Sequence, residues 1–213
     1  MLLIPLMLRS PQSSVSLKTT DDKATLQRLS NFSQVMKIKC RENLEVETYH
    51  HPHYQSLNEK LMDDFSKINF YSHEKVSDHT NIKGSQFGFG GKQLSLKPNG
   101  VTLIENWVEQ IIRNKLTLIP GINFATWAAR LDKGQQTLEH DHLFYATFAF
   151  VYFVNAPKGS SPLIFTTSGK KIKAESGKLV LFPAPLRHKV PVNKCDNRVT
   201  IASNITMMQK GVA

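Results

Sequence analysis

From residue 119 onward the sequence is a succession of short β-forming runs, and this pattern limits the fold more than any other feature. Turn-forming residues such as Asp132-Lys133-Gly134 and Asp196-Asn197 separate most of the runs. Many short strands at this spacing are typical of a β-sandwich or a barrel. We therefore predict strands over residues 123–131, 137–142, 146–154, 163–167, 171–174, 178–182, 188–192 and 198–205.

Two segments ahead of these strands have the apolar spacing of helices. The first is residues 58–68, where Leu61 and Phe65 lie one helical turn apart. The second is residues 102–116, where Thr102 and Glu105 match a capping box. Its apolar stripe predicts core packing and comprises Leu103, Ile104, Trp107, Val108, Ile111 and Ile112. Helices followed by strands favour helices packed on the outside of one sheet.

The rest of the N-terminal half is less regular. Residues 71–99 are rich in Gly, Ser, Asn and His and predict a long loop. Alternating apolar residues predict strands over residues 35–40 and 44–49. Residues 1–34 begin with MLLIPLMLRS and continue as a polar, Ser/Thr-rich segment. We expect residues 1–34 to be a partly ordered extension and residues 35–213 to form one domain.

Charge and composition limit the partners and the compartment. A formal net charge of +10 indicates either an acidic partner, such as nucleic acid or an acidic protein, or a basic solvated surface. The apolar start is too short to span a bilayer, so we expect a soluble protein that uses no membrane. Two cysteines, Cys40 and Cys195, provide neither a disulfide framework nor a Cys-rich zinc site. A reducing, cytoplasmic compartment is the simplest assumption. Nothing in the sequence indicates the oligomeric state.

Three histidines in the strand-rich half have the arrangement of a metal site. His140 and His142 lie two apart in a predicted strand, so both side chains point to the same face. His188 opens a later strand. Imidazole is the commonest protein ligand for transition metals, and three ligands on one side of a metal leave positions open for small molecules. The simpler explanation of the pair alone is a polar strand face.

Arg198 follows His188 by ten residues and adds a potential anion site. If residues 188–192 and 198–205 pair as antiparallel strands, Arg198 faces the barrel interior with Thr200 on the same face. A buried guanidinium needs an anionic partner, and a carboxylate is its natural bidentate match. A metal with open positions beside this Arg–Thr pair describes a site for a keto acid. Thr200 by itself is explained equally well as a β-forming residue.

The order of these residues resembles the Fe(II)/2-oxoglutarate-dependent oxygenases: His-x-(Asp or His), a distal His, and Arg-x-(Ser or Thr) about ten residues later. The similarity is greatest to the branch found in phages and marine bacteria, and it covers the C-terminal 80 or so residues best. The pieces that carry it are Trp127-Ala128-Ala129-Arg130, Gly134, His140-Asp141-His142, residues 150–153, Gly177-Lys178-Leu179-Val180-Leu181-Phe182-Pro183, His188, and residues 198–204.

This resemblance implies a fold and a reaction. The fold is a double-stranded β-helix, or cupin-like jelly roll, mainly β with supporting helices. 2-Oxoglutarate chelates Fe(II) through its 2-oxo group and C1 carboxylate, while Arg198 holds the C5 carboxylate. Thr200 and Tyr152 are further candidates for binding this co-substrate; Tyr152 is otherwise an aromatic core residue. O2 takes the remaining position, and oxidative decarboxylation to succinate and CO2 accompanies oxidation of a substrate, usually a hydroxylation.

The metal ligands depart from the family pattern in one position. The usual set is two histidines and one carboxylate, whereas His142 occupies the place where Asp is most familiar. Asp141 is adjacent, but a regular strand turns it to the opposite face unless a bulge intervenes. The third ligand is therefore either His142 or a carboxylate.

Several alternatives remain open from the sequence. One alternative to the oxygenase is a cupin-like three-histidine metalloenzyme that uses no 2-oxoglutarate. Another is a non-catalytic jelly-roll binding protein. His50, His51 and His53 form a second cluster, which a surface loop explains better than a second metal site. A basic hairpin formed by residues 170–178, with Arg187 and Lys189, is either solvated charge or a patch for nucleic acid or an acidic protein. The primary substrate and the product are not readable.

Overall fold

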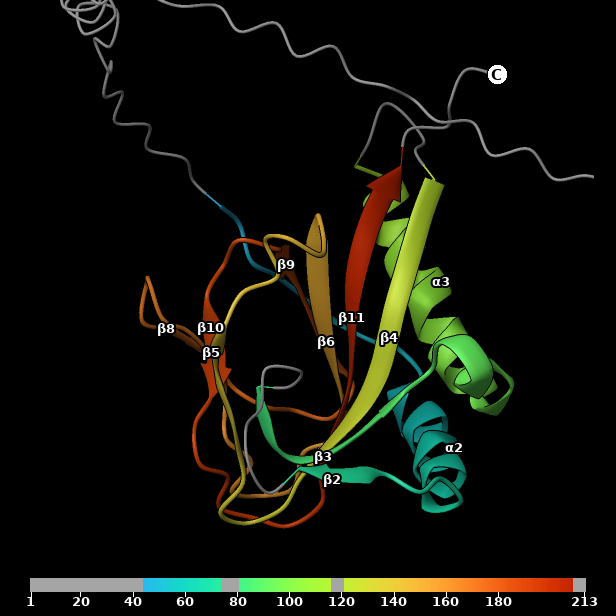
Figure 1. Cartoon of the computed structure of the whole chain (residues 1–213), viewed down its shortest axis with the longest axis vertical. Coiled ribbons are helices and arrows are strands. Elements are labelled where there is room, and N and C mark those ends of the chain that lie inside the picture. Colours follow the sequence, from blue (N-terminus) through green and yellow to red (C-terminus); the bar gives the residue numbers. More distant parts are fainter. Residues whose placement is uncertain (1–43, 74–80, 116–120, 209–213) are drawn as a thin grey trace, which may run out of the picture. The chain divides into compact units, whose positions relative to one another are not determined.

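Strand β11 (Arg198–Met208) is central to the sheet in the computed structural model, which describes residues 44–73, 81–115 and 121–208 (Figure 1). It pairs antiparallel with β4 (Gly121–Leu131) along its whole length and with β6 (Phe148–Asn155) on its other side. The predicted strand over residues 35–40 and the extension over residues 1–34 lie outside the described residues.

The sheet continues on both sides of these three strands and curls around. Beyond β6 lie β9 (Lys178–Pro183) and β1 (Glu47–His50). Beyond β4 lies β3 (Ile82–Gly88), which also pairs with β2 (Tyr71–His73). From β3 the order continues through β5 (Gln136–His140), β10 (His188–Val190), β7 (Leu163–Phe165) and β8 (Lys170–Ile172). The second group of strands faces the first, as Figure 1 shows, and the mainly β jelly roll that the sequence predicts is confirmed.

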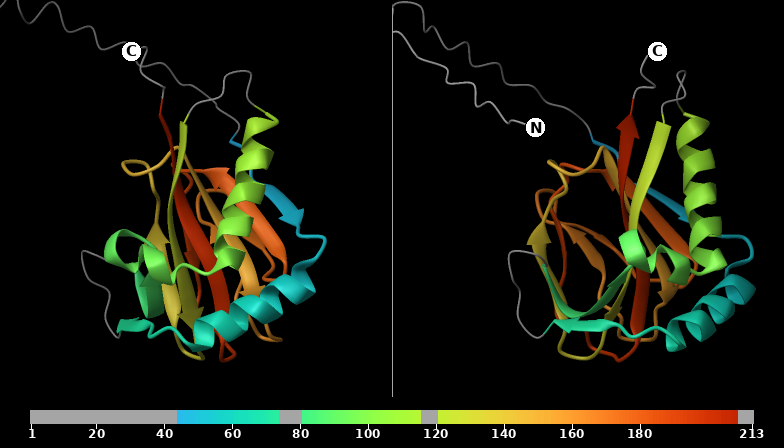
Figure 2. Two further views of the ribbon diagram at one scale, coloured as in Figure 1. Left: turned by 90° about the vertical axis from the view of Figure 1, so that its right-hand side faces the viewer. Right: turned by 45° about the vertical axis from the view of Figure 1, so that its right-hand side comes forward.

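Two helices cover the outer face of the sheet, on the side away from β5 and β10 (Figure 2). Helix α2 (Tyr54–Ser66) buries Leu57, Leu61 and Phe65, which recur every fourth residue and so share one face. Helix α3 (Asn99–Arg113) buries Val101, Ile104, Val108 and Ile112 against the same core. Both helices were predicted, although each begins earlier than the sequence pattern indicates.

The predicted capping box of α3 does not form. Pro98 precedes the helix and makes no side-chain cap, while Glu105 turns inward. The Glu105 carboxylate forms an ion pair with Lys97 and accepts a hydrogen bond of 2.6 Å from Thr126 Oγ1. The stripe is also rotated from the prediction, because Leu103 is exposed. A cap pattern in the sequence competes here with a tertiary contact to β4, and the tertiary contact prevails.

The long loop predicted over residues 71–99 is wrong. The segment holds β2, β3 and a short 3₁₀ helix, η1 (Gly91–Leu96). Its polar, Gly-rich composition does not indicate a strand, but β3 is held by pairing with β2, β4 and β5. Gly84 shows why glycine is needed there: a Cβ would lie 2.6 Å from the Leu131 side chain and 2.9 Å from the Arg130 carbonyl oxygen.

The central strands separate two cores by simple alternation. On β11, Val199, Ile201 and Ile205 face the helices. The residues between them face the interior of the roll, where Phe153 and Phe182 belong to a second cluster. The alternating residues of β11 from Arg198 to Asn204 therefore lie beside the cavity described below.

We predict that Asn58 stabilises the seam between α2 and the sheet. Its Nδ2 donates to the Val154 carbonyl at 2.7 Å, and the Tyr152 hydroxyl donates to its Oδ1 at 2.8 Å. Asn58→Ala leaves both buried groups without these partners and should lower the free energy of unfolding by about 1–3 kcal/mol in urea titration. Exposed Glu59 on the same helix is the matched control, and Glu59→Ala should change it by less than about 0.5 kcal/mol. Equal losses in the two variants would contradict the role.

Candidate metal centre and its pocket

His140, His142 and His188 come together at one place in the roll. His140 is the last residue of β5, His188 is the first of β10, and the two are directly paired. The candidate ligand nitrogens of the three rings all lie within 4.8 Å of one another. Within the parts of the chain that the structure describes, this is the one group of three such side chains.

His142 reaches the cluster by a different route from the predicted one. It lies two residues beyond the end of β5, in a turn, and is not part of the strand. Its backbone N–H donates to the Ala184 carbonyl at 2.9 Å, which fixes the turn against the segment that leads into β10. The neighbouring Asp141 carboxylate instead accepts a hydrogen bond from the Leu143 N–H and is not part of the group.

Backbone contacts orient two of the rings. Nδ1 of His140 lies 2.8 Å from the Leu138 carbonyl oxygen, and Nδ1 of His188 lies 2.8 Å from that of Leu186. A carbonyl only accepts, so each Nδ1 carries the proton and each Nε2 keeps a free lone pair. This arrangement is the usual one for histidines that bind a metal through Nε2.

Burial keeps the three imidazoles neutral, which is the ligand form. Desolvation lowers the pKa of His188 to about 3 and that of His142 to about 4, and it also lowers the pKa of His140. The proximity of the rings adds to the effect, because a charge on His140 disfavours a charge on His142 and His188. The group is therefore three neutral nitrogen donors at neutral pH.

The histidines line a cavity of about 490 Å³ inside the roll. Its inner walls are apolar, with Leu131, Leu163 and Val190 among the lining side chains. Arg198 and Thr200 line the same cavity. The structure therefore brings together the three histidines, the arginine and the threonine that the sequence singled out.

Arg198 is a buried cation that has no anionic partner among the described residues. Its side chain is 2% exposed, and burial lowers the pKa of its guanidinium to about 10. Nε donates to the Ser161 carbonyl at 3.2 Å, and the guanidinium lies 5.1 Å from the centre of the Phe153 ring. The Nη2 atom is buried and has no hydrogen-bond partner within the described part of the chain. A buried charged donor left unpaired is costly, so this atom marks a place for an anion.

Arg198 reaches the interior without the strand pairing that the sequence analysis considered for it. Strands β10 and β11 do not pair; β10 lies between β5 and β7, and β11 lies between β4 and β6. The connection after β10 crosses from one sheet to the other. Arg198 nevertheless faces the cavity, because it begins β11 opposite Leu131.

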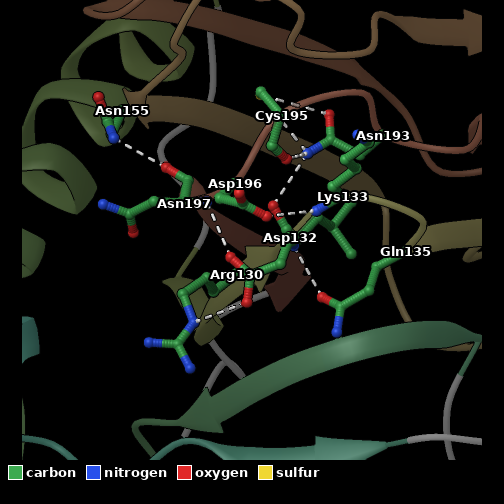
Figure 3. Close-up of polar contacts among 10 residues, drawn as sticks. Arg130, Asp132, Lys133, Gln135, Asn155, Asn193, Cys195, Asp196 and Asn197 are labelled. Atoms are coloured by element: carbon green, nitrogen blue, oxygen red, sulfur yellow. Dashed lines mark hydrogen bonds and ion pairs between the residues drawn. The ribbon is translucent and has the colours of Figure 1, made fainter.

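A polar network holds this crossing in place (Figure 3). Buried Asn193 donates from Nδ2 to the carbonyls of Leu131 and Cys195, at 2.9 and 2.7 Å, and its Oδ1 accepts from the Ser161 N–H at 3.0 Å. Asn197, with φ of 58°, donates its N–H to Asp132 Oδ1 at 2.8 Å. The network fixes both the start of β11 and the Ser161 segment that contacts the guanidinium.

Tyr152 does not reach the cavity, contrary to its predicted contact with the co-substrate. Its side chain is fully buried on the helix side of β6, where it packs near Trp107 and donates its hydroxyl to Asn58. The reason is register: Tyr152 pairs with Ile201, and both face the helices. The neighbouring residue Val151 faces the other way and lines the cavity.

Sequence reasoning missed other residues of the cavity. Asn204, Gln86 and Trp127 line it, and Ser161 contacts Arg198. Asn204 and Trp127 were inside the quoted motifs, and the alternation that placed Thr200 beside Arg198 extends to Asn204. Gln86 lies in the segment that was expected to be a loop.

In the second histidine cluster, two of the rings pack against aromatic side chains. His51 packs edge-on against Trp107, with ring centres 5.0 Å apart, and its Nδ1 accepts from the His53 N–H. His50 packs in the same way against Tyr54.

No helix among the described residues is long and apolar enough to cross a membrane.

The sequence matches no protein-family model and no curated protein. Solved structures are similar at low identity. Viral collagen prolyl hydroxylase from Paramecium Bursaria Chlorella virus-1 is 16% identical with a TM-score of 0.59, over 83% of this chain and 98% of that one. A Pseudomonas putida prolyl-4-hydroxylase is 14% identical with a TM-score of 0.59, over 79% and 94%. A Trichoplax adhaerens prolyl hydroxylase is 13% identical with a TM-score of 0.60, over 91% and 94%. The chain therefore has the jelly-roll fold of the Fe(II)/2-oxoglutarate-dependent oxygenases.

Proposed function

We propose that the protein is an Fe(II)- and 2-oxoglutarate-dependent dioxygenase, most simply a hydroxylase. The observation that carries the proposal is the unpaired, buried guanidinium of Arg198 in the same cavity as three neutral histidines. One feature binds a metal and the other binds an anion. A keto acid with a second carboxylate satisfies both at once.

The donor set fits Fe(II), with His140, His142 and His188 as the proposed ligands. Imidazole nitrogens suit iron, and three of them on one side leave positions for a bidentate co-substrate and for O2. Three neutral ligands leave the full 2+ charge of the ion uncompensated by the protein. That charge attracts a dianionic keto acid. The usual carboxylate ligand would cancel part of the charge and weaken this attraction.

The other residues of the inner cavity have roles that follow from their positions. Arg198 binds the far carboxylate of 2-oxoglutarate, and Thr200 offers a hydroxyl beside it on the same strand face. The apolar walls exclude water, which strengthens the attraction between guanidinium and carboxylate. When bound, the iron and co-substrate supply the oxidising chemistry, and the protein supplies the binding, orientation and dryness.

The solved neighbours support the co-substrate and leave the primary substrate open. One viral collagen prolyl hydroxylase structure is a 2-oxoglutarate complex, and Streptomyces hygroscopicus HygX holds nickel, 2-oxoglutarate and hygromycin B. The Trichoplax enzyme is bound to a peptide fragment. These neighbours therefore span polypeptide and small-molecule ligands on one fold.

The charge of the basic hairpin bears on the partner, and the free thiol bears on the compartment. The basic hairpin is partly neutralised, since Glu175 pairs with Lys173 and Lys178, and Arg187 pairs with Glu139. This disfavours nucleic acid or an acidic protein as the substrate at that place. We place the activity in the cytoplasm, where Cys195, a free thiol, and Fe(II) both stay reduced.

The first test is loss of a ligand. His188→Ala should weaken Fe(II) binding by at least about a hundredfold, because removing even a partner that only orients a ligand costs tenfold to a hundredfold. Binding is measured anaerobically by competition with a chelator. His53→Ala is the matched control, because His53 is exposed and outside the cluster, and it should bind Fe(II) as the wild type does. Unchanged affinity and stoichiometry in His188→Ala would remove the metal assignment.

The second test separates the oxygenase from a three-histidine cupin that uses no 2-oxoglutarate. Arg198→Ala should retain Fe(II) and lose affinity for 2-oxoglutarate by about thirtyfold or more, corresponding to about 2–5 kcal/mol for one buried charge-assisted pair. The signal is the weak charge-transfer absorption of the anaerobic Fe(II) protein on addition of 2-oxoglutarate. If the wild type shows neither this band nor succinate formation, the cupin alternative is the better one.

A further inference from the structure

The cavity extends beyond the region that the proposed co-substrate occupies. Along β11 the cavity-facing residues follow in the order Arg198, Thr200, Ala202 and Asn204. The His142 ring lies 6.5 Å from the ring of Trp127, the β4 partner of Ala202. Arg198 and Asn204 therefore lie on opposite sides of the histidines along the strand.

The distance along β11 indicates that 2-oxoglutarate anchored at Arg198 does not reach Asn204. Six residues of strand separate the two positions, or about 20 Å at 3.4 Å per residue. A five-carbon chain is shorter than about 7 Å. The region beside Asn204 is thus left for the primary substrate.

Asn204 offers a hydrogen bond in that region. Asn204 lines the cavity. Its Oδ1 is buried and has no hydrogen-bond partner among the residues that the structure describes, so a ligand would reach it by a small rotation of the amide. A carboxamide presents an acceptor and a donor together, which complement an amide group of a ligand. A buried acceptor without a partner favours a ligand that donates to it.

Gly88 leaves room beside this amide. It pairs with Trp127 and lines the cavity, and a Cβ built at Gly88 would meet no atom within 4 Å. The space next to the Trp127 ring is therefore free of side chains. A ligand can extend past the metal centre there and lie against an aromatic surface.

An apolar rim adjoins the same region. Leu143, Phe144 and Tyr145 directly follow His142, and their side chains are 53%, 88% and 71% exposed. Tyr145 also lines the cavity, so the rim is continuous with it. Adjacent exposed apolar side chains of this size indicate contact with a partner larger than the cavity.

The charged residues of the cavity distinguish between a polypeptide and a nucleic acid as the partner. The charged side chains that line the cavity, apart from the histidines, are Arg198 at the inner end and Asp141, and lysine is absent from the lining. Nucleic acid binding depends on cations that neutralise phosphates. An acidic side chain and an apolar rim disfavour a phosphate backbone and favour an uncharged ligand that carries amides.

We propose that the outer half of the cavity and the rim formed by Leu143, Phe144 and Tyr145 bind an uncharged segment of a polypeptide substrate. Asn204 hydrogen-bonds an amide of that segment, and the segment passes over Gly88 beside Trp127. The inference rests on the proposed oxygenase function for its chemistry, but the binding itself does not depend on turnover.

The test measures binding to peptides directly. The probes are fluorescent pools of random-sequence decapeptides, each pool with one fixed central residue, and binding to the full chain is read by fluorescence anisotropy. At least one pool should bind the wild type. For that pool we expect Asn204→Ala to weaken binding about threefold to tenfold, as for the loss of one hydrogen bond. Phe144→Ser should weaken it about tenfold.

Two further variants make the result specific. Gly88→Leu fills the free space without a steric clash at Cβ and should abolish binding of the same pool. Leu103→Ser is the matched control, because Leu103 is an exposed apolar residue on α3 outside the cavity, and it should bind within twofold of the wild type. Thermal unfolding of each variant shows whether a loss reflects the fold.

Succinate formation provides the second readout. The bound pool should stimulate 2-oxoglutarate turnover, scored within each variant as the ratio of stimulated to unstimulated rate. Peptide binding with the expected variant pattern but without any 2-oxoglutarate turnover would remove the oxygenase function and retain the polypeptide site.

Four results would overturn the inference: no pool binds; Asn204→Ala and Phe144→Ser bind as the wild type does; a random single-stranded oligonucleotide pool binds in preference to peptides; or the wild type is a dimer that Phe144→Ser dissociates. The last would assign the rim to a second copy of the chain.

Discussion

The pairing of β11 with β4 and β6 is the interaction on which the rest of the structure depends. β11 and β4 are in register from Arg198 opposite Leu131 to Met208 opposite Gly121. Because side chains alternate along a strand, one register assigns every residue of β11 to one of two environments. Val199 and Ile201 join the core beneath the helices, while Arg198, Thr200 and Asn204 join the cavity. A slip of one residue toward the start of the strand would place the Arg198 guanidinium on the side of the hydrophobic core and Val199 at the proposed anion site.

Much of this arrangement could be predicted because local signals agree with the tertiary structure. The turns around Asp132 and Asn197 punctuate the strands, and the predicted strand over residues 198–205 matches the start of β11 at Arg198. The shared orientation of Arg198 and Thr200 follows from spacing, since residues two apart share a face in any regular strand. The predicted assignment to the phage and marine-bacterial branch stays a prediction.

The sequence predictions fail where pairing between distant segments of the chain determines the local structure. Strand β3 looks like a loop because its glycines and polar residues serve close packing against Leu131 and a lining role that local propensity does not encode. Tyr152 is assigned to the wrong side because its face depends on which residue of β11 lies opposite, which the sequence does not state. The convergence of His142 likewise depends on a backbone hydrogen bond to Ala184, 42 residues away in the chain.

The cavity is built around an electrostatic imbalance. Three neutral imidazoles and an unpaired guanidinium line one cavity, and no carboxylate among the described residues pairs with Arg198. The packing of the two sheets and the Asn193 network hold this arrangement against the cost of burying an uncompensated cation. Preorganisation of this kind means that an anion entering the cavity meets donors already in place and displaces no competing protein group.

The position of β11 in the chain also has a consequence for how the protein reaches this state. β11 follows β4 and β6 in sequence yet lies between them in the sheet, so before it arrives both strands have an open edge facing a gap. β6 carries the run Phe148–Asn155, rich in aromatic and β-branched residues, and such an edge readily recruits strands from other molecules. While the chain is being synthesised, the roll therefore keeps two unpaired strand edges until β11 is available. The yield of folded protein in a cell should depend on how quickly β11 is synthesised and on chaperones that cover the open edges of β4 and β6 until then.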